Sequence, residues 1–341
     1  MAGNSSLGAA KVAKVDEFYT QLADIENELR HYREHFRGKT VLCNCDDPRI
    51  SNFFKYFALN FELLGLKRLI ATCYKNSEPD IFSQHECEQA VYIIYEGDKN
   101  GNKNPDPEEM NVIPLKGDGD FRSQECIELL KQADIVCTNP PFSLFREYLA
   151  QLIKYQKQFI IIGNLNAIHY KEVFPLIRQN KLWMGQTRFN GGAAFFFGSI
   201  ELYDPKKMSS EKHAFIKDGK LYWRVNGVRW FTNIDIPKRH EELILYKTYN
   251  PDDYPSYLNY DGIDVSKVSE IPVDYFGNMG VPDTFVEVYN PEQFEILGLG
   301  SGDLAKEIGV QKNYRGRTDI SYMKDGVPKC PYSRIIIRRK K

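Results

Sequence analysis

One stretch of the sequence decides the fold: Asp134-Ile135-Val136-Cys137-Thr138-Asn139-Pro140-Pro141-Phe142. The apolar residues at its start predict a buried strand, and Ser143-Leu144-Phe145 opens a helical pattern directly after it. A strand that runs straight into a helix is typical of an open parallel α/β sheet, which binds ligands at the carboxyl ends of its strands. We therefore expect Asn139-Pro140-Pro141-Phe142 at a ligand site.

The residue types of this tetrapeptide suit methyl transfer to an amino group conjugated with a ring. Such a nitrogen is a poor nucleophile until fixed acceptors hold its N–H bonds and stabilise the positive charge that develops on it. Asn139 offers its side-chain oxygen and Pro140 its backbone carbonyl, while Pro141 fixes the direction of that carbonyl. Phe142 offers a flat face on which a base swung out of a duplex can stack. The chemistry requires neither a nucleophilic side chain nor a metal.

The tetrapeptide also has a purely structural interpretation. Asn is a good helix cap and Pro is favoured in the first helical turn, so the motif could simply join a strand to a helix. The context favours the functional interpretation, because an apolar strand precedes the motif and an aromatic residue stands fourth in it.

Strand and helix patterns alternate along the first half of the chain. Strands are expected at residues 40–45, 68–73, 90–95, 134–137 and 159–162, and helices at 15–37, 50–64, 123–132, 143–156 and 168–180. The polar stretch 96–111 is expected to be a loop. This alternation predicts an α/β fold with a doubly wound, mostly parallel, Rossmann-like sheet.

The pattern becomes β-rich after about residue 181. A hairpin is expected over 221–230, with Asn226-Gly227 as a type I′ turn. From about residue 250, Pro, Gly, Asn and Tyr dominate, which indicates loops ordered by aromatic side chains. We accordingly divide the chain into a flexible N-terminus (1–14), a catalytic domain (15–200) and a β- and loop-rich C-terminal region for target recognition (201–341).

The composition is that of an ordinary soluble protein, with 42% hydrophobic and 27% charged residues. The sequence carries no secretory signal and no apolar run of membrane-spanning length, so we expect a cytoplasmic location without membrane contact. Seven cysteines without Cys-x-x-Cys spacing are expected to be thiols of a reducing compartment. The absence of a Pro-Cys dipeptide disfavours a cytosine-C5 methyltransferase, which needs a cysteine nucleophile.

Charge is unevenly distributed along the chain. The net charge is −1, yet residues 311–341 hold ten Lys or Arg and two Asp, a net of +8, which leaves −9 for the rest. A polyanion needs a local basic surface. The candidates for contacts with DNA phosphates are Arg315, Arg317, Arg334, Arg338, Arg339, Lys340 and Lys341. The alternative is a solvated basic terminus.

The first strand ends in Asn44-Cys45-Asp46-Asp47-Pro48, without a Gly-rich phosphate-binding fingerprint. A methyl donor with an adenosyl group carries an ammonium at its amino-acid end, and the carboxylate of Asp46 or Asp47 is expected to meet it. A compatible structural alternative has Asp47 as N-cap and Pro48 at the first helical position.

The turn Gly117-Asp118-Gly119-Asp120-Phe121 resembles the adenine-binding turn of methyltransferases. In that interpretation Asp120 accepts a hydrogen bond from the donor's adenine amino group and Phe121 packs on its ring. Asp120 is preferred to Asp118 because it directly precedes the aromatic residue. A surface turn without a ligand is the alternative, and Thr72-Cys73-Tyr74 at the end of the second strand offers no carboxylate for a ribose.

Taken in order, these segments resemble the EcoRI modification-enzyme family of adenine-specific DNA methyltransferases. The resemblance is carried, beyond the Asn-Pro-Pro-Phe motif, by Asp46-Asp47-Pro48 and by residues 190–198, 232–235 and 275–282. It implies N6-methylation of adenine in a specific duplex site, S-adenosylmethionine as donor, and a C-terminal half that reads the sequence. It also suggests a cognate restriction endonuclease that shares the site without forming a stable complex.

The residues alone leave other functions open. Asn-Pro-Pro-aromatic sites also serve RNA bases, cytosine N4 and the side-chain amide of protein glutamine, and a panel of substrates separates these. A non-catalytic nucleic-acid-binding protein on a methyltransferase fold is a further alternative, suggested by the missing Gly-rich loop. Binding of the donor would exclude it.

Overall fold

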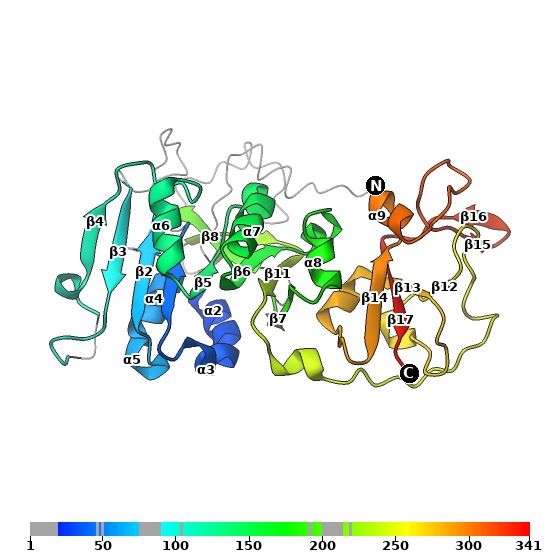
Figure 1. Cartoon of the computed structure of the whole chain (residues 1–341), viewed down its shortest axis with the longest axis horizontal. Helices are drawn as coiled ribbons and strands as arrows, with labels where there is room; N and C mark the ends of the chain where they lie inside the picture. Colours follow the sequence, from blue (N-terminus) through cyan, green and yellow to red (C-terminus); the bar gives the residue numbers. More distant parts are fainter. Residues whose placement is uncertain are drawn as a thin grey trace. The chain divides into compact units, whose positions relative to one another are not determined.

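The computed structural model describes residues 20–45, 48, 51–74, 90–102, 105–189, 193–199, 214–217 and 220–341. The chain folds into two compact units (Figure 1). The first comprises Met1–Ala167 and Gly185–Ile234, and the second comprises Ile168–Met184 and Asp235–Lys341.

The first unit is built on an eight-stranded sheet with the strand order β4-β3-β2-β1-β5-β6-β11-β7. Its four middle strands, β2, β1, β5 and β6, run parallel to one another. On one side β3 is antiparallel to β2 and β4 to β3, and on the other side β11 is antiparallel to β6. The strands are β1 (Thr40–Cys43), β2 (Arg68–Thr72), β3 (Val91–Tyr95), β4 (Asn111–Pro114), β5 (Ile135–Thr138), β6 (Gln158–Asn164), β7 (Trp183–Arg188) and β11 (Val228–Thr232). The predicted α/β fold is confirmed.

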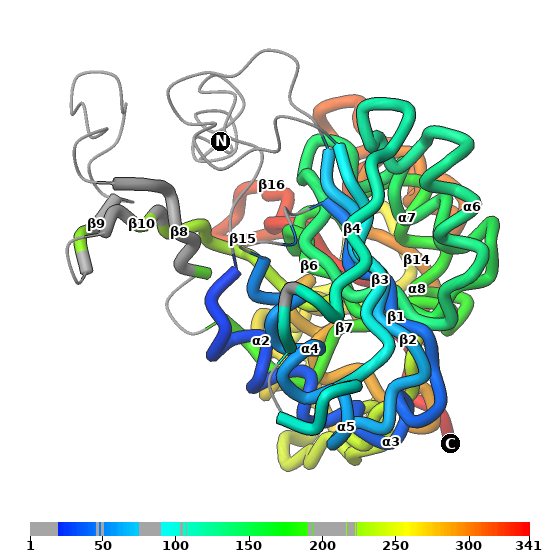
Figure 2. Tube along the Cα trace, turned by 90° about the vertical axis from the view of Figure 1, so that its left-hand side faces the viewer, coloured from blue at the N-terminus to red at the C-terminus, as the bar shows by residue number. Residues whose placement is uncertain are grey.

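Helices cover both faces of this sheet, as a doubly wound fold requires. Figure 2 shows α2 and α4 on one side of the parallel strands and α6 and α7 on the other. The strands between them are mostly apolar and buried, with polar residues only at their ends, and β1 and β5 are completely buried. The helices of this unit are α2 (Leu22–Leu29), α3 (Arg33–Phe36), α4 (Asn52–Leu59), α5 (Phe61–Leu64), α6 (Gln124–Gln132) and α7 (Phe145–Lys154).

The hairpin predicted over 221–230 is wrong. β10 (Lys220–Val225) pairs with β8 (Ala193–Ser199) and β9 (Ala214–Lys217) in a separate three-stranded sheet, whereas β11 pairs with β6. The turn at Asn226-Gly227 exists, but only Gly227 has a positive φ (+76°), so it is not type I′. Trp230 and Phe231 of β11 are buried in the large sheet, and this burial places β11 in the first unit, beyond the boundary expected at residue 200.

Several element boundaries also differ from the predictions. The helix expected over 15–37 is interrupted after α2 by the 3-10 turn η1 (Arg30–Tyr32), and the helix expected over 50–64 divides into α4 and α5. The edge strand β4 was not predicted, and it begins at Asn111, the last residue of the segment expected to be a loop. Cys73 at the end of β2 is disulfide-bonded, so the expectation of free thiols is wrong for that residue.

The second unit contains a four-stranded sheet in the order β12-β13-β17-β14 and a two-stranded ribbon, β15-β16. Its last strand, β17, buries Ile335, Ile336 and Ile337, so the C-terminal segment is a core strand. The elements of this unit are α8 (Phe174–Arg178), β12 (Ile263–Asp264), β13 (Met279–Pro282), β14 (Phe294–Leu299), α9 (Gly302–Glu307), β15 (Tyr322–Lys324), β16 (Val327–Lys329) and β17 (Arg334–Arg339).

Candidate active site

A pocket of about 220 Å³ lies in the first unit, at the carboxyl ends of the parallel strands. It brings the predicted donor turn before α6 together with the motif that follows β5, as expected for ligand sites of open α/β sheets. Its lining residues are Asn44, Cys45, Tyr74, Gly119, Asp120, Phe121, Arg122, Pro141, Ser143 and Leu144.

The Asn-Pro-Pro-Phe motif begins directly after β5. Asn139 is buried (7% exposed) and Pro140 is buried beside it, whereas Pro141 and Phe142 are half-buried. The Pro141 carbonyl accepts from the Leu144 N–H at 3.0 Å and starts the 3-10 turn η3 (Phe142–Leu144), which leads into α7. Leu144 is the N-cap of α7 and Pro141 that of η3, so Asn139 caps neither and the capping interpretation of Asn139 is wrong.

Asn44, which the sequence did not single out as a site residue, joins three elements at the pocket. Its backbone oxygen accepts from the Thr138 hydroxyl at the end of β5, and its side-chain oxygen accepts from the Tyr148 hydroxyl of α7. Burial raises the pKa of Tyr148 well above its ordinary value, so this hydroxyl stays protonated and remains a donor. The end of β1 is therefore fixed to both β5 and α7.

The chain makes the turn after β1 without glycine. Cys45 has φ +79°, a left-handed conformation that favours glycine and costs other residues about 1–2 kcal/mol. Cys45 is half-buried and lines the pocket. A strained non-glycine residue thus stands near the place where the sequence lacks a Gly-rich loop.

Two of the residues expected to bind the methyl donor at this turn, Asp46 and Asp47, lie outside the described residues. Pro48 is described and lies in a turn. The next helix, α4, begins at Asn52, and its N-cap is Ser51, whose hydroxyl accepts from the Phe54 N–H at 3.4 Å. The expectation that Asp47 caps this helix and Pro48 takes its first position is wrong.

The other segment expected to bind the methyl donor, residues 117–121, forms a tight turn against the end of β2. Gly119 has φ +81°, and a Cβ at this position would collide with the backbone oxygen of Cys73. Asp118 stabilises the turn by accepting from the Asp120 N–H at 3.0 Å. Asp118 therefore has a role within the turn, and of the two carboxylates only that of Asp120 lines the pocket.

The Asp120 carboxylate is held by Arg122. Oδ1 accepts from the backbone N–H and Nε of Arg122 at 2.8 and 2.9 Å, and Oδ2 accepts from Nη2 at 2.6 Å. These hydrogen bonds lower the pKa of Asp120. Since a carboxylate oxygen can accept two hydrogen bonds, Oδ2 keeps one acceptor position for a ligand. Nη1 of Arg122 bonds to Glu147 at 3.0 Å, away from the pocket lining.

Phe121 is fixed from several sides and is 8% exposed. Its ring packs edge-on against Tyr148 with centroids 5.0 Å apart, and the Arg122 guanidinium lies 5.4 Å from its centroid. Its carbonyl accepts from the Gln151 side chain at 2.9 Å. The ring is thus held at the wall of the pocket by α7.

The basic residues near the C-terminus belong to the second unit, and several are bound within it. Arg334 forms a bidentate ion pair with the fully buried Asp264, at 2.9 Å from Nε to Oδ1 and 3.3 Å from Nη2 to Oδ2. The Tyr257 hydroxyl donates to the same carboxylate at 2.9 Å. Because the Arg334 side chain is only 11% exposed, this pair accounts for Arg334 without a phosphate.

Of the other candidates at the C-terminus, Arg338 and Arg339 lie at the end of β17, and Lys340 and Lys341 follow it. Arg338 is exposed and donates to the Asn278 side-chain oxygen at 3.2 and 2.8 Å, and Arg339 donates to the Val273 carbonyl. Lys340 donates to the Pro291 carbonyl at 2.7 Å, and Lys341 is exposed. The basic segment is therefore an ordered part of the fold, with Arg338, Lys340 and Lys341 exposed to solvent. Contact with DNA phosphates and a solvated basic terminus both remain predictions.

The described residues contain no cluster of three or more His, Cys, Asp or Glu that could hold a metal ion. Within the same residues, no helix is long and apolar enough to cross a membrane.

Comparisons with known proteins place this geometry in a family context. Residues 6–340 match the family model described as "Adenine-specific methyltransferase EcoRI". The chain is 47% identical over 344 residues to the Type II methyltransferase M.EcoRI of Escherichia coli, an alignment that covers 100% of this chain and 98% of that protein. It is 38% identical to the Type II methyltransferases M.MgeORF184P of Mycoplasma genitalium and M.MpnI of Mycoplasma pneumoniae, with 97% of each chain covered. No solved structure matches the chain significantly.

Proposed function

The chain belongs to the EcoRI family of adenine-specific methyltransferases, and from this premise we propose how its own residues carry out the reaction. It is a DNA adenine methyltransferase. The single observation that carries the assignment of the site is that Asp120, Phe121 and Pro141 line one pocket at the carboxyl ends of the parallel strands.

We assign the pocket to the methyl donor, which in enzymes of this class is S-adenosylmethionine. When bound, this cofactor would supply an electrophilic methyl group on a sulfonium. Asp120 would accept from the adenine amino group through Oδ2, and Phe121 would pack against the adenine ring. For the ammonium at the amino-acid end, Asp46 or Asp47 remains the candidate from the sequence.

Asn139 and Pro140 are assigned to the target adenine. Their side-chain and backbone oxygens would accept from the amino group that receives the methyl, and they would stabilise the positive charge that develops on its nitrogen. Phe142 is half-buried at the start of η3, where its ring can stack on an adenine flipped out of the duplex. The adjacent Pro141 joins this half of the site to the donor pocket.

Target recognition is assigned to the second unit. Its main segment, Asp235–Lys341, starts later than the expected region 201–341, because β11 belongs to the sheet of the first unit. Double-stranded DNA is its partner. We further propose a cytoplasmic location and a restriction endonuclease that shares the recognition site without binding this chain stably.

The test is incubation of the full chain with labelled S-adenosylmethionine and unmethylated genomic DNA, followed by digestion and nucleoside analysis. We expect the label in N6-methyladenine. Matched reactions with RNA and with a protein extract test the alternative substrates, and label in N4-methylcytosine would assign the amino group differently. Calorimetry without DNA tests donor binding separately, so a non-catalytic binding protein would be recognised by its failure to bind the donor.

A further inference from the structure

The two-stranded ribbon β15-β16 stands apart from the four-stranded sheet of its unit (red in Figure 1). Its register pairs Tyr322 with Lys329, Met323 with Pro328 and Lys324 with Val327. Asp325 and Gly326 join the strands with φ values of 54° and 73°, the two positive values that a type I′ turn requires. The ribbon is thus a regular hairpin with a tight tip.

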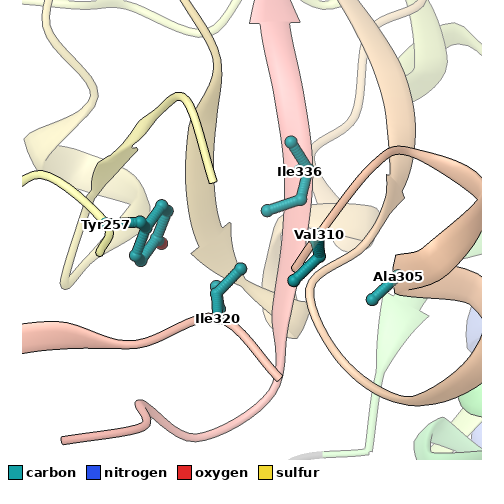
Figure 3. Close-up of a cluster of buried hydrophobic side chains, with 5 residues drawn as sticks. All are labelled: Tyr257, Ala305, Val310, Ile320 and Ile336. Carbon is teal, nitrogen blue, oxygen red and sulfur yellow. The ribbon is translucent and has the colours of Figure 1, made fainter. Parts of the chain in front are cut away.

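The base of the ribbon is anchored in a hydrophobic cluster. Ile320, just before β15, packs with Tyr257, Ala305, Val310 and Ile336 in a buried cluster, and Tyr322 packs against it (Figure 3). Tyr257 and Tyr322 also form an isolated β-bridge. A two-stranded hairpin is marginally stable by itself, and this packing supplies the missing support.

Hydrogen bonds fix the backbone at the same point. The Asn259 side-chain oxygen accepts from the N–H and the hydroxyl of Ser321 at 2.8 and 3.0 Å. Its amide group donates to the carbonyls of Gln311 and Asp319 at 2.7 and 2.9 Å. Asn259 therefore ties the ribbon to the loop that precedes it in the chain.

That preceding loop holds two exposed arginines on a rigid backbone. The buried Asn313 side chain accepts from the backbone N–H groups of Arg315 and Arg317 at 2.8 and 3.3 Å. Its amide donates to the Asp319 carbonyl at 3.0 Å. The backbone of both arginines is set before any ligand arrives, while their side chains remain exposed.

The surface formed by this loop and the ribbon is positively charged and partly apolar. Residues 311–330 contain five Lys or Arg and two Asp, a net charge of +3. Lys324 and Lys329 are exposed and make no ion pair in the described part of the chain. Val327 is 55% exposed and pairs with Lys324 on the same face of the ribbon, whereas Met323, 45% exposed, lies on the opposite face. Unpaired cations next to exposed apolar side chains indicate a binding surface.

We propose that the β15-β16 ribbon enters the major groove of the target duplex, with Lys324 and Val327, which share one face of the ribbon, at base edges and Arg315 and Arg317 on flanking phosphates. This inference rests on the proposed function and names the element that reads the DNA. The major groove is about 12 Å wide and admits a two-stranded ribbon. Lys suits the acceptors of guanine, and apolar side chains suit the methyl group of thymine.

The test compares Lys324→Ala with the double variant Arg315→Ala/Arg317→Ala in the full chain. Methylated adenines are first mapped on genomic DNA with the unmodified enzyme, which defines the recognition sequence. Each variant is then assayed on a duplex with that sequence and on duplexes with one altered base pair. Lys267→Ala is the matched control, because it removes an exposed lysine of the same unit that pairs with Glu270 outside the ribbon.

For Lys324→Ala we expect the ratio of kcat/KM between cognate and altered duplexes to fall about tenfold, the loss of one base contact. For the arginine variant we expect equally weaker binding to all duplexes and a salt slope smaller by about 1.8, or 0.9 per phosphate contact. Lys267→Ala should change neither quantity. Unchanged discrimination in Lys324→Ala, or a loss equal on every duplex, would overturn the groove assignment. Failure of the proposed function would look different, because the unmodified enzyme would then leave adenine in DNA unmethylated.

Discussion

Replacing Asp120 with alanine tests the donor pocket most directly. Oδ2 of Asp120, a residue that lines the pocket, receives one hydrogen bond from Arg122, at 2.6 Å, and has one acceptor position left. A hydrogen bond to a charged group contributes about 1.5–3 kcal/mol. Losing it should raise the dissociation constant of S-adenosylmethionine about 10- to 150-fold. DNA affinity should stay nearly unchanged.

Titration calorimetry with S-adenosylmethionine measures this change, and Glu147→Gln is the matched control. Glu147 also holds Arg122, at 3.0 Å, but does not line the pocket. The control should bind the donor normally, which separates the loss of the acceptor from the release of Arg122. Normal donor affinity in Asp120→Ala, or an equal loss in Glu147→Gln, would refute the role of Asp120.

The pH dependence of donor binding follows from the same contact. Arg122 lowers the pKa of Asp120, so the carboxylate is ionised throughout the range above the ordinary carboxyl pKa of 3.8. Its contribution to binding should be constant there and disappear only as the pH falls through the lowered pKa. A contribution that already fades near neutral pH would mean that another group titrates.

Three further substitutions probe the remaining assignments. Asn139→Ala should slow methyl transfer about 10²–10³-fold without changing donor affinity, since the acceptor acts as charge develops; near-normal turnover would remove Asn139 from the mechanism. Phe142→Ala should weaken capture of the flipped adenine by about 1–3 kcal/mol, seen as a smaller response of an adenine analogue that fluoresces on unstacking, and an unchanged response contradicts stacking. Arg334→Ala should lower the free energy of unfolding by about 3–5 kcal/mol, because it leaves the carboxylate of Asp264 buried without its cation. Thermal melting measures this loss of stability, with Arg338→Ala, a change of an exposed arginine, as the control. Equal melting temperatures of the two variants would contradict the role of Arg334.

The sequence predicts the catalytic half of this chain well because its signals are local. An apolar run predicts a buried parallel strand, and β5 ends at Thr138, immediately before the motif. The turn at Gly119 was recognisable because glycine is needed where backbone meets backbone. Both segments lie at the same edge of the sheet, as the topology of parallel strands requires.

The features that the sequence did not reveal depend on pairing between distant segments. β10 and β11 are separated by a two-residue turn, yet β10 pairs with β8 and β9 whereas β11 joins the large sheet. Nothing in the local sequence distinguishes the two strands. The basic residues near the C-terminus gave a correct picture of charge, yet the partner of Arg334 is Asp264, 70 positions earlier. Charge along the chain therefore indicates what a surface could bind, and only the fold decides which cations remain free for it.

Methyl transfer requires the two halves of the site to be fixed relative to each other, since reacting atoms must approach to about 3–3.5 Å in an aligned geometry. In this chain Asn44 connects them. Its backbone oxygen holds Thr138, the residue before Asn139, and its side chain holds Tyr148. Tyr148 in turn packs against Phe121 of the donor pocket. One buried residue at the end of β1 therefore couples the position of the methyl acceptor site to that of the donor site, although it contributes no group to the chemistry proposed here.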